Sequence, residues 1–178
     1  MQRLSQARVS IRPPTPRDCR AFLAAVRRSH SLHYPWVSPP DTPKAFASYL
    51  RRLSSDCHWG FLLINRQTGD IIGVINLNNL IGGNFQSAFL GYYAFLPHAG
   101  QGLMQEGMLL VLTHAFQHLK LHRLEANIQP GNRASIALVR RCGFVREGLS
   151  LRYLKIYGRW KDHERWAILA DTFRLGYR

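Results

Sequence analysis

The chain is poor in acidic residues and cysteine, and it has no long apolar segment. Asp and Glu together number 10 against 24 Lys and Arg, and only three residues are Cys. The longest apolar run, Met108 to Leu112, is far shorter than the about 20 residues that a membrane span requires. The first 20 residues contain proline and arginine in place of an apolar segment, which argues against a secretory signal. These features favour a cytoplasmic protein without membrane contact.

The placement of cysteine and histidine argues against a metal site. The three cysteines are widely spaced and form no Cys-x-x-Cys pair: Cys19, Cys57 and Cys142. This pattern indicates buried thiols in a reducing compartment, and neither a disulfide framework nor a zinc site. His114 and His118 could meet a zinc ion on one helix face, but no carboxylate or cysteine stands near them in the sequence. We therefore expect no metal.

Length and charge narrow the class of protein. A chain of 178 residues, 46% hydrophobic and 19% charged, is typical of one domain with its own core, spanning residues 1–178. The net charge of +14 is carried by residues 1–60 and 121–178, which flank a neutral centre. Such a field attracts nucleic acid, the ribosome, phosphorylated cofactors or an acidic protein. Solvated arginines without a partner are the alternative.

Hydrophobic periodicity and turn residues predict alternating strands and helices. The predicted strands cover residues 9–12, 59–65, 71–77, 87–95, 123–128, 151–157 and 160–170. Helices are predicted near residues 16–29, 43–53, 103–120 and 133–142, with residues 30–40 as a loop. This order predicts an α/β fold of the α+β type. We expect a mixed, mostly antiparallel, splayed sheet of about seven strands with helices on both faces.

A glycine pair stands at the start of the third long helix. Gly100-Gln101-Gly102 would let the backbone approach a ligand, and the helix start offers unpaired N–H groups and a partial positive charge. Such a site suits a pyrophosphate, with the amides of Gly100, Gln101, Gly102, Leu103 and Met104 as candidate donors. An ordinary tight turn is the alternative. The pattern is neither a Rossmann fingerprint nor a Walker P-loop, because their further residues are missing.

Motifs on both sides of this loop carry a family resemblance. They are Tyr34-Pro35-Trp36, Ile72-Gly73, Gly91-Tyr92, Pro130-x-Asn132-x-x-Ser135 and Gly143-Phe144. In order and spacing they resemble the GNAT superfamily of N-acetyltransferases, and most closely the RimJ/RimL type of ribosomal-protein N-acetyltransferase. The resemblance covers nearly the whole chain. It implies acetyl-CoA as co-substrate and acetyl transfer to a primary amine, in the first place the N-terminal α-amino group of a protein such as a ribosomal protein.

The resemblance also implies roles for individual residues. Ala94 and Phe95 would pair with the pantetheine arm like an added strand, and a backbone N–H there would polarise the thioester carbonyl. Asn132 and Ser135 would contact the pantetheine and its thiol end. Ser135 would also protonate the departing thiolate, because Val139 stands where many members have a tyrosine. The alternative for Ser135 is a polar residue that belongs to the helix start.

Two positions depart from the pattern of the resembled family. Pro97 replaces the Gln or Arg that usually opens the loop motif, and we expect the later amides to hold the co-substrate without it. Related enzymes place an acid on the strand 123–128 where this chain has Asn127. Glu125 shares that strand face and is the candidate general base, with an ion pair to Arg123 as the alternative.

Three functions are compatible with the sequence. Besides a protein N-terminus, the acceptor amine could be a small molecule, although the positive charge disfavours polyamines. The third possibility is a non-catalytic RNA- or ribosome-binding domain on the same fold. By resemblance, the aromatic segment His33 to Trp36 would line the acceptor site. The alternative is a purely structural role, in which its side chains fill the space under the loop. We expect a monomer or a homodimer.

Overall fold

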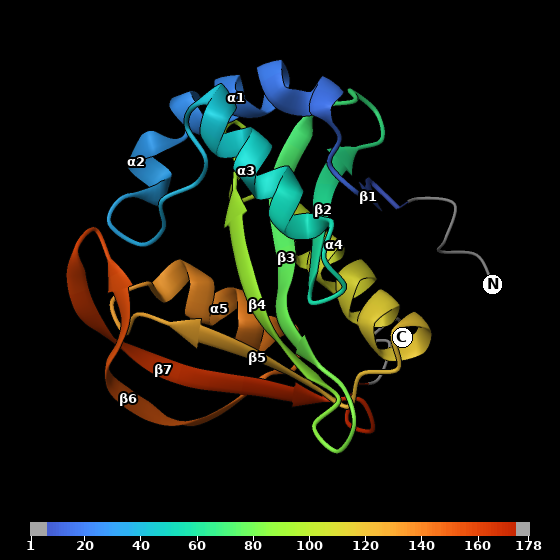
Figure 1. Cartoon of the computed structure of the whole chain (residues 1–178), viewed down its shortest axis with the longest axis vertical. Helices are drawn as coiled ribbons and strands as arrows, with labels where there is room; N and C mark the ends of the chain where they lie inside the picture. Colours follow the sequence, from blue (N-terminus) through green and yellow to red (C-terminus); the bar gives the residue numbers. More distant parts are fainter. Residues whose placement is uncertain (1–6, 174–178) are drawn as a thin grey trace.

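One seven-stranded sheet runs through the protein (Figure 1). The computed structural model describes residues 7–173. The strands are β1 (Val9–Arg12), β2 (His58–Asn65), β3 (Ile71–Ile81), β4 (Ser87–Ala94), β5 (Arg123–Ile128), β6 (Val145–Ile156) and β7 (Arg159–Leu169). Their order in the sheet is β1-β2-β3-β4-β5-β7-β6. Every neighbouring pair is antiparallel except β4 and β5, which are parallel. The predicted mixed, mostly antiparallel sheet is confirmed.

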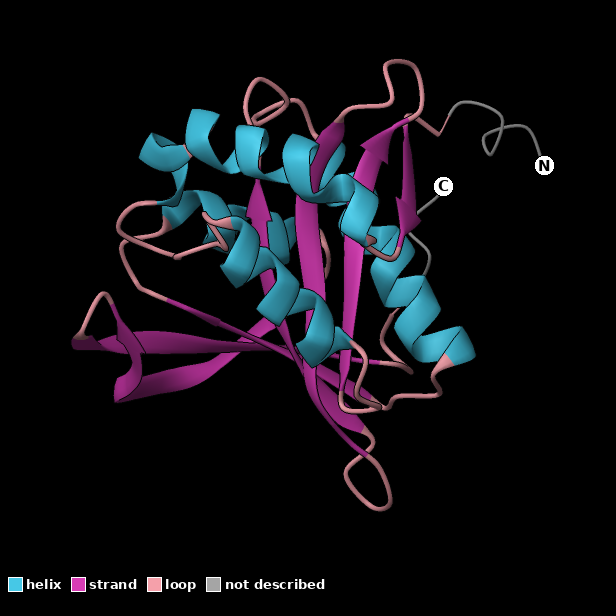
Figure 2. Cartoon of the chain, turned by 45° about the horizontal axis from the view of Figure 1, so that its top comes forward, coloured by secondary structure: helices cyan, strands magenta, loops and turns pink. Residues whose placement is uncertain are grey.

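Helices cover both faces of the sheet (Figure 2). They are α1 (Cys19–Arg28), α2 (His30–His33), α3 (Pro43–Leu53), α4 (Leu103–Thr113) and α5 (Arg133–Arg141), with a 3-10 turn at Pro16–Asp18 and a π-helical turn at His114–His118. Phe22 of α1 and Phe46 of α3 pack on one face, while Met108 of α4 and Val139 of α5 pack on the other. No helix among residues 7–173 is long and apolar enough to cross a membrane.

Capping residues fix where the helices begin. Thr15 and Asp18 form a capping box in front of α1, and the hydroxyl of Thr42 accepts the N–H of Ala45 at 3.2 Å. Both caps are followed by a proline whose missing N–H costs nothing at that position. The predicted starts of the first two long helices are therefore confirmed.

Two predictions about secondary structure were wrong. The predicted loop 30–40 contains the short helix α2, which His33 anchors to the sheet by a hydrogen bond between its Nε2 and the carbonyl of Ala94 at 2.8 Å. The strand predicted from residue 151 begins at Val145. Its first half, the sequence VREGLS, has no regular alternation of apolar and polar residues that would indicate a strand; β6 lies at the edge of the sheet and is largely exposed.

The sheet opens in its middle, between β4 and β5. These strands pair only along Ser87–Leu90 and Arg123–Ala126, and Figure 1 shows them diverging beyond that point. Each strand therefore has an edge that faces the opening, which we call the β4–β5 gap. Because both strands run parallel into loops that start α4 and α5, the N-termini of these two helices lie at the open end of the gap.

Candidate functional site

The loop before α4 presents unpaired backbone donors. Gly100 and Gly102 both adopt a left-handed backbone with φ 79°, which glycine adopts without steric cost. Among residues 7–173, none of the amides at positions 100–104 donates a hydrogen bond to another part of the chain. A Cβ on Gly100 would meet no atom of residues 7–173 within 4 Å, so these residues leave the loop surface open. Free amides at a helix start suit a diphosphate.

Arg8 places a positive charge beside this loop. Its Nε donates to Glu106 Oε1 at 2.8 Å, and its guanidinium donates to the carbonyl of Gln101 at 3.2 Å. Arg8 thereby offsets the negative charge of Glu106 near the helix start, where an anionic ligand would otherwise be repelled. No local sequence pattern indicates this contact, because the two residues lie 98 positions apart.

On the opposite side of the gap, α5 presents Ser135. The side-chain oxygen of Asn132 accepts the N–H of Ser135 at 3.1 Å, which caps the helix. The hydroxyl of Ser135 lies 2.6 Å from the hydroxyl of Tyr92 on β4. Burial raises the pKa of Tyr92 well above its usual value, so the phenol stays protonated. Strand β4 and helix α5 are thus linked on the face of the sheet that α4 and α5 cover.

The backbone at the end of β4 distinguishes Ala94 from Phe95. The N–H of Phe95 donates to the carbonyl of Ile72 on β3 at 2.7 Å, and the Phe95 side chain is fully buried. Because successive residues of a strand point their backbone groups to opposite sides, the groups of Ala94 face the β4–β5 gap. The carbonyl of Ala94 bonds to His33, and its N–H lies beyond Leu90, the last residue of β4 that pairs with β5.

On β5 the structure separates the two predicted polar residues. Asn127 lies directly beyond the last residue that pairs with β4, and its buried Oδ1 has no hydrogen-bond partner in the described part of the chain. Glu125 lies within the paired part and accepts from Arg123 Nε at 2.8 Å. Arg123 also binds Glu147 on β6. The ion pair expected as the alternative for Glu125 is therefore present, and Asn127 is the residue at the gap.

The segment after α2 closes against the β6–β7 hairpin. The hydroxyl of Tyr157 donates to the carbonyl of Val37 at 3.0 Å, and the rings of Tyr34 and Tyr157 lie 5.3 Å apart. The side-chain amide of Gln129 donates to the carbonyl of Trp36 at 3.2 Å. Since Gln129 directly follows β5, these contacts bring the aromatic segment close to the end of that strand.

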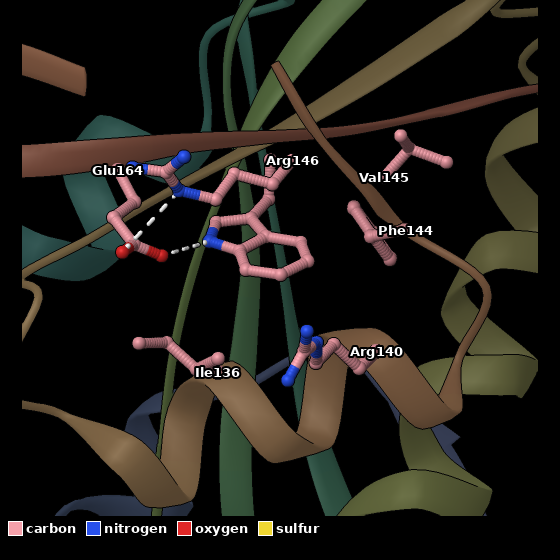
Figure 3. A pocket seen from close by; sticks show the side chains of 7 residues that line it. Ile136, Arg140, Phe144, Val145, Arg146 and Glu164 are labelled. Carbon is pink, nitrogen blue, oxygen red and sulfur yellow. Dashed lines mark hydrogen bonds and ion pairs between the residues drawn. The ribbon is translucent and has the colours of Figure 1, made fainter. Parts of the chain in front are cut away.

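A separate hollow of about 510 Å³ lies between α5 and the strands β6 and β7. Figure 3 shows Ile136 and Arg140 of α5 facing Arg146 and Glu164 across it. Arg146 pairs with Glu164 at 3.3 Å. None of the predicted site residues lines this hollow, so it is distinct from the β4–β5 gap.

No group of three or more His, Cys, Asp or Glu in residues 7–173 is arranged to hold a metal ion. His114 and His118 lie near each other in the π-helical turn, with ring centroids 5.2 Å apart. The cysteines of this part of the chain are free thiols, and Cys142 is buried in the core.

Comparison with known proteins identifies the class to which this site belongs. The family model "Acetyltransferase (GNAT) domain" matches residues 8–145. The structure of Mycobacterium smegmatis RimJ in complex with CoA-disulfide superposes with a TM-score of 0.84 at 28% identity, over 92% of this chain and 82% of that chain. The chain belongs to the GNAT acetyltransferase family, and the predicted resemblance to that family is confirmed.

Two curated relatives are similar over much of the domain. The probable N-acetyltransferase YjcK of Bacillus subtilis (strain 168) is 38% identical over 126 residues, 71% of this chain and 70% of that protein. The ribosomal protein uS5-alanine N-acetyltransferase of Escherichia coli (strain K12) is 37% identical over 116 residues, 65% of this chain and 60% of that protein. The match thus spans less than three quarters of either relative. By family, the chain is an N-acetyltransferase.

Tyr92 was not predicted from the sequence as a residue of the site. The alternation of residues along the strand nevertheless predicts the face to which its side chain points. Ala88 and Leu90 are apolar residues of the same strand, and alternation places Tyr92 on their face. That face packs against α4 and α5, so the pattern alone directs Tyr92 toward the helices that flank the gap.

Proposed function

We propose that this chain transfers the acetyl group of acetyl-CoA to the α-amino group at the N-terminus of a protein. The observation that carries the proposal is the β4–β5 gap, whose open end is flanked by the amides before α4, unpaired within residues 7–173, and by the start of α5 with Ser135. In acetyl-CoA an amide-bearing arm joins the diphosphate to the thioester. Such a molecule needs donors for the diphosphate first, then a strand edge for the arm, and then a donor at the sulfur. The arm would add to the free edge of β4 as an extra strand.

Binding of the co-substrate falls to backbone groups in this proposal. The amides of Gly100, Gln101, Gly102, Leu103 and Met104 hold the diphosphate. The N–H of Ala94 pairs with the pantetheine arm, whereas Phe95 contributes by fixing the end of β4 to β3. Asn132 caps α5 and so places Ser135 at the thiol end.

The chemistry of the reaction asks little of the protein. An α-amino group has a pKa of about 8, so a fraction of it is uncharged at neutral pH and can attack the thioester directly. Asn127 directly follows the part of β5 that pairs with β4, and its buried Oδ1 has no partner among residues 7–173; in this proposal that oxygen accepts an N–H of the amine and orients its lone pair. Glu125, the predicted base, keeps Arg123 in place through its ion pair. The hydroxyl of Ser135 donates a hydrogen bond to the leaving sulfur.

The acceptor assignment rests on the relatives and on charge. One relative is named for acetylating the alanine of ribosomal protein uS5, and a chain with a net charge of +14 suits an acceptor that is acidic or bound to RNA. A polyamine acceptor would be repelled by the same charge. The net positive charge also favours contact with the ribosome, which would bring such an acceptor within reach.

A panel of acceptors tests the proposal. Purified protein is mixed with acetyl-CoA and with peptides that begin with alanine or serine, the same peptides with a blocked N-terminus, or spermidine, and CoA release is measured. We expect turnover only with free N-terminal peptides. If spermidine is acetylated and none of the peptides is, the acceptor is a small amine and not a protein N-terminus. Strong RNA binding without affinity for acetyl-CoA would indicate a binding domain in place of an enzyme.

A further inference from the structure

The hydroxyl pair between β4 and α5 has a consequence for the leaving group. We propose that Tyr92 is a positioning residue, which donates its phenol proton in a hydrogen bond to Ser135 and so directs the Ser135 hydroxyl toward the departing sulfur. The proposal rests on the proposed function, because it requires the thiol end of CoA to lie at the start of α5. The geometric basis is the 2.6 Å distance between the two oxygens.

The direction of this hydrogen bond follows from the surroundings. A serine hydroxyl has one proton to donate and can accept two hydrogen bonds, whereas a buried phenol needs an acceptor for its own proton. Ser135 is the partner of the Tyr92 hydroxyl in the structure. Burial raises the pKa of Tyr92, so it keeps its proton throughout the pH range of the enzyme. When Tyr92 donates, the proton of Ser135 is free to point into the gap.

This arrangement makes up for a missing residue on α5. Many members of the resembled family carry a tyrosine where this chain has Val139, and Val139 is fully buried in the core. A serine alone is a weak donor that rotates freely. A donor fixed by a second hydroxyl loses less rotational freedom when it binds charge, and chains of hydrogen bonds polarise one another. Tyr92 on β4 therefore supplies a second hydroxyl near the leaving sulfur, which α5 lacks.

The step can be written with all protons accounted for. The lone pair of the amine forms the N–C bond, the C–S bond breaks, and its electron pair goes to sulfur as a thiolate. The proton that the amine loses reaches the thiol through solvent. Ser135 stabilises the thiolate by a hydrogen bond, and neither hydroxyl changes its protonation state. A phenol of raised pKa suits this role, because it is a permanent donor and a poor acid.

The titration of bound CoA provides a test that needs no acceptor. The ultraviolet absorbance of the thiolate gives the pKa of the CoA thiol when it is bound to the wild-type protein and to the variants. We expect Tyr92→Phe to raise this pKa so that the thiolate fraction falls three- to tenfold, the value of about one hydrogen bond. Ser135→Ala should have an equal or larger effect. The double variant should match Ser135→Ala, because Tyr92 acts only through Ser135.

The neighbouring tyrosine provides a matched control. Tyr93 follows Tyr92 on β4, points to the opposite face, and has a buried hydroxyl with no partner among the described residues. Tyr93→Phe removes the same atom from the same strand and should leave the thiol pKa unchanged. With any active acceptor, Tyr92→Phe should lower kcat about tenfold and keep KM for acetyl-CoA within twofold.

The outcomes separate the two proposals. If wild-type protein does not bind CoA, the proposed function fails and this inference fails with it. If CoA binds but Tyr92→Phe behaves like Tyr93→Phe, only the role of Tyr92 is overturned. Additive effects in the double variant also contradict it, since they would mean that Tyr92 acts independently of Ser135.

Discussion

Replacing Gly102 by valine tests the diphosphate site before α4. Gly102 is the cap residue of α4 and has φ 79°, a backbone that a residue with a Cβ adopts only with strain of about 1–2 kcal/mol. Within the described part of the chain, a Cβ would meet only the guanidinium of Arg8, at 3.5 Å, so we expect the fold to tolerate the change. The new side chain adds bulk at the loop whose amides are proposed to hold the diphosphate.

Two effects of the Gly102 substitution can be calculated separately. Strain of about 1–2 kcal/mol lowers the melting temperature by roughly 2–8 °C for a chain of this size. Loss of close approach to the amides weakens CoA binding at least tenfold, which is about 1.4 kcal/mol. Calorimetric titration with CoA measures the second effect at a temperature where the variant is fully folded.

A glycine far from the loop separates strain from binding. Gly83 lies in the turn between β3 and β4 and has φ 60°, and a Cβ added to it would meet no atom of residues 7–173 within 4 Å. Gly83→Val should therefore destabilise the fold to a similar degree and leave the affinity for CoA unchanged. If Gly102→Val loses stability but binds CoA as tightly as the wild type, the amides before α4 do not hold the diphosphate.

Three other substitutions test separate parts of the molecule. Glu125→Gln should keep kcat within about threefold, because Glu125 is engaged with Arg123; a loss of about a hundredfold in a CoA-release assay would make it the base. Arg12 holds the pKa of Asp18 at about 2, below the unfolded value of about 3.9. The resulting stability, up to about 2 kcal/mol, is present above about pH 4 and declines as pH falls toward about 2, so urea unfolding of Asp18→Asn should show a weaker pH dependence there. Gly107→Ala would place a Cβ 1.9 Å from a leucine side chain of β2. This overpacking should lower the free energy of unfolding by about 1–3 kcal/mol, which a lower melting temperature would report.

Much of the fold could be predicted from the sequence because local signals and packing agree. The start of α3 follows from Thr42 and Pro43, and strand β5 has the predicted bounds because its residues alternate between buried and half-buried. The short helix α2 could not be predicted in this way. It has four residues and no capping side chain, and the tertiary contact of His33 with β4 stabilises it.

The site was predictable where it depends on the backbone and less so where it depends on side chains from distant elements. The glycines before α4 indicate a free helix start, since the left-handed backbone there favours them. The contacts of Arg8 with Glu106 and of Tyr92 with Ser135 join residues 98 and 43 positions apart. Only the tertiary fold brings these residues together, so no local pattern could show that they meet.

A crystal structure with acetyl-CoA tests the proposed co-substrate site most directly. We predict diphosphate oxygens about 3 Å from the amides of Gly102, Leu103 and Met104, with the pantetheine arm in the β4–β5 gap and its sulfur next to Ser135. Acetyl-CoA bound instead in the hollow between α5 and the strands β6 and β7, with the loop amides free of any phosphate, would contradict this prediction.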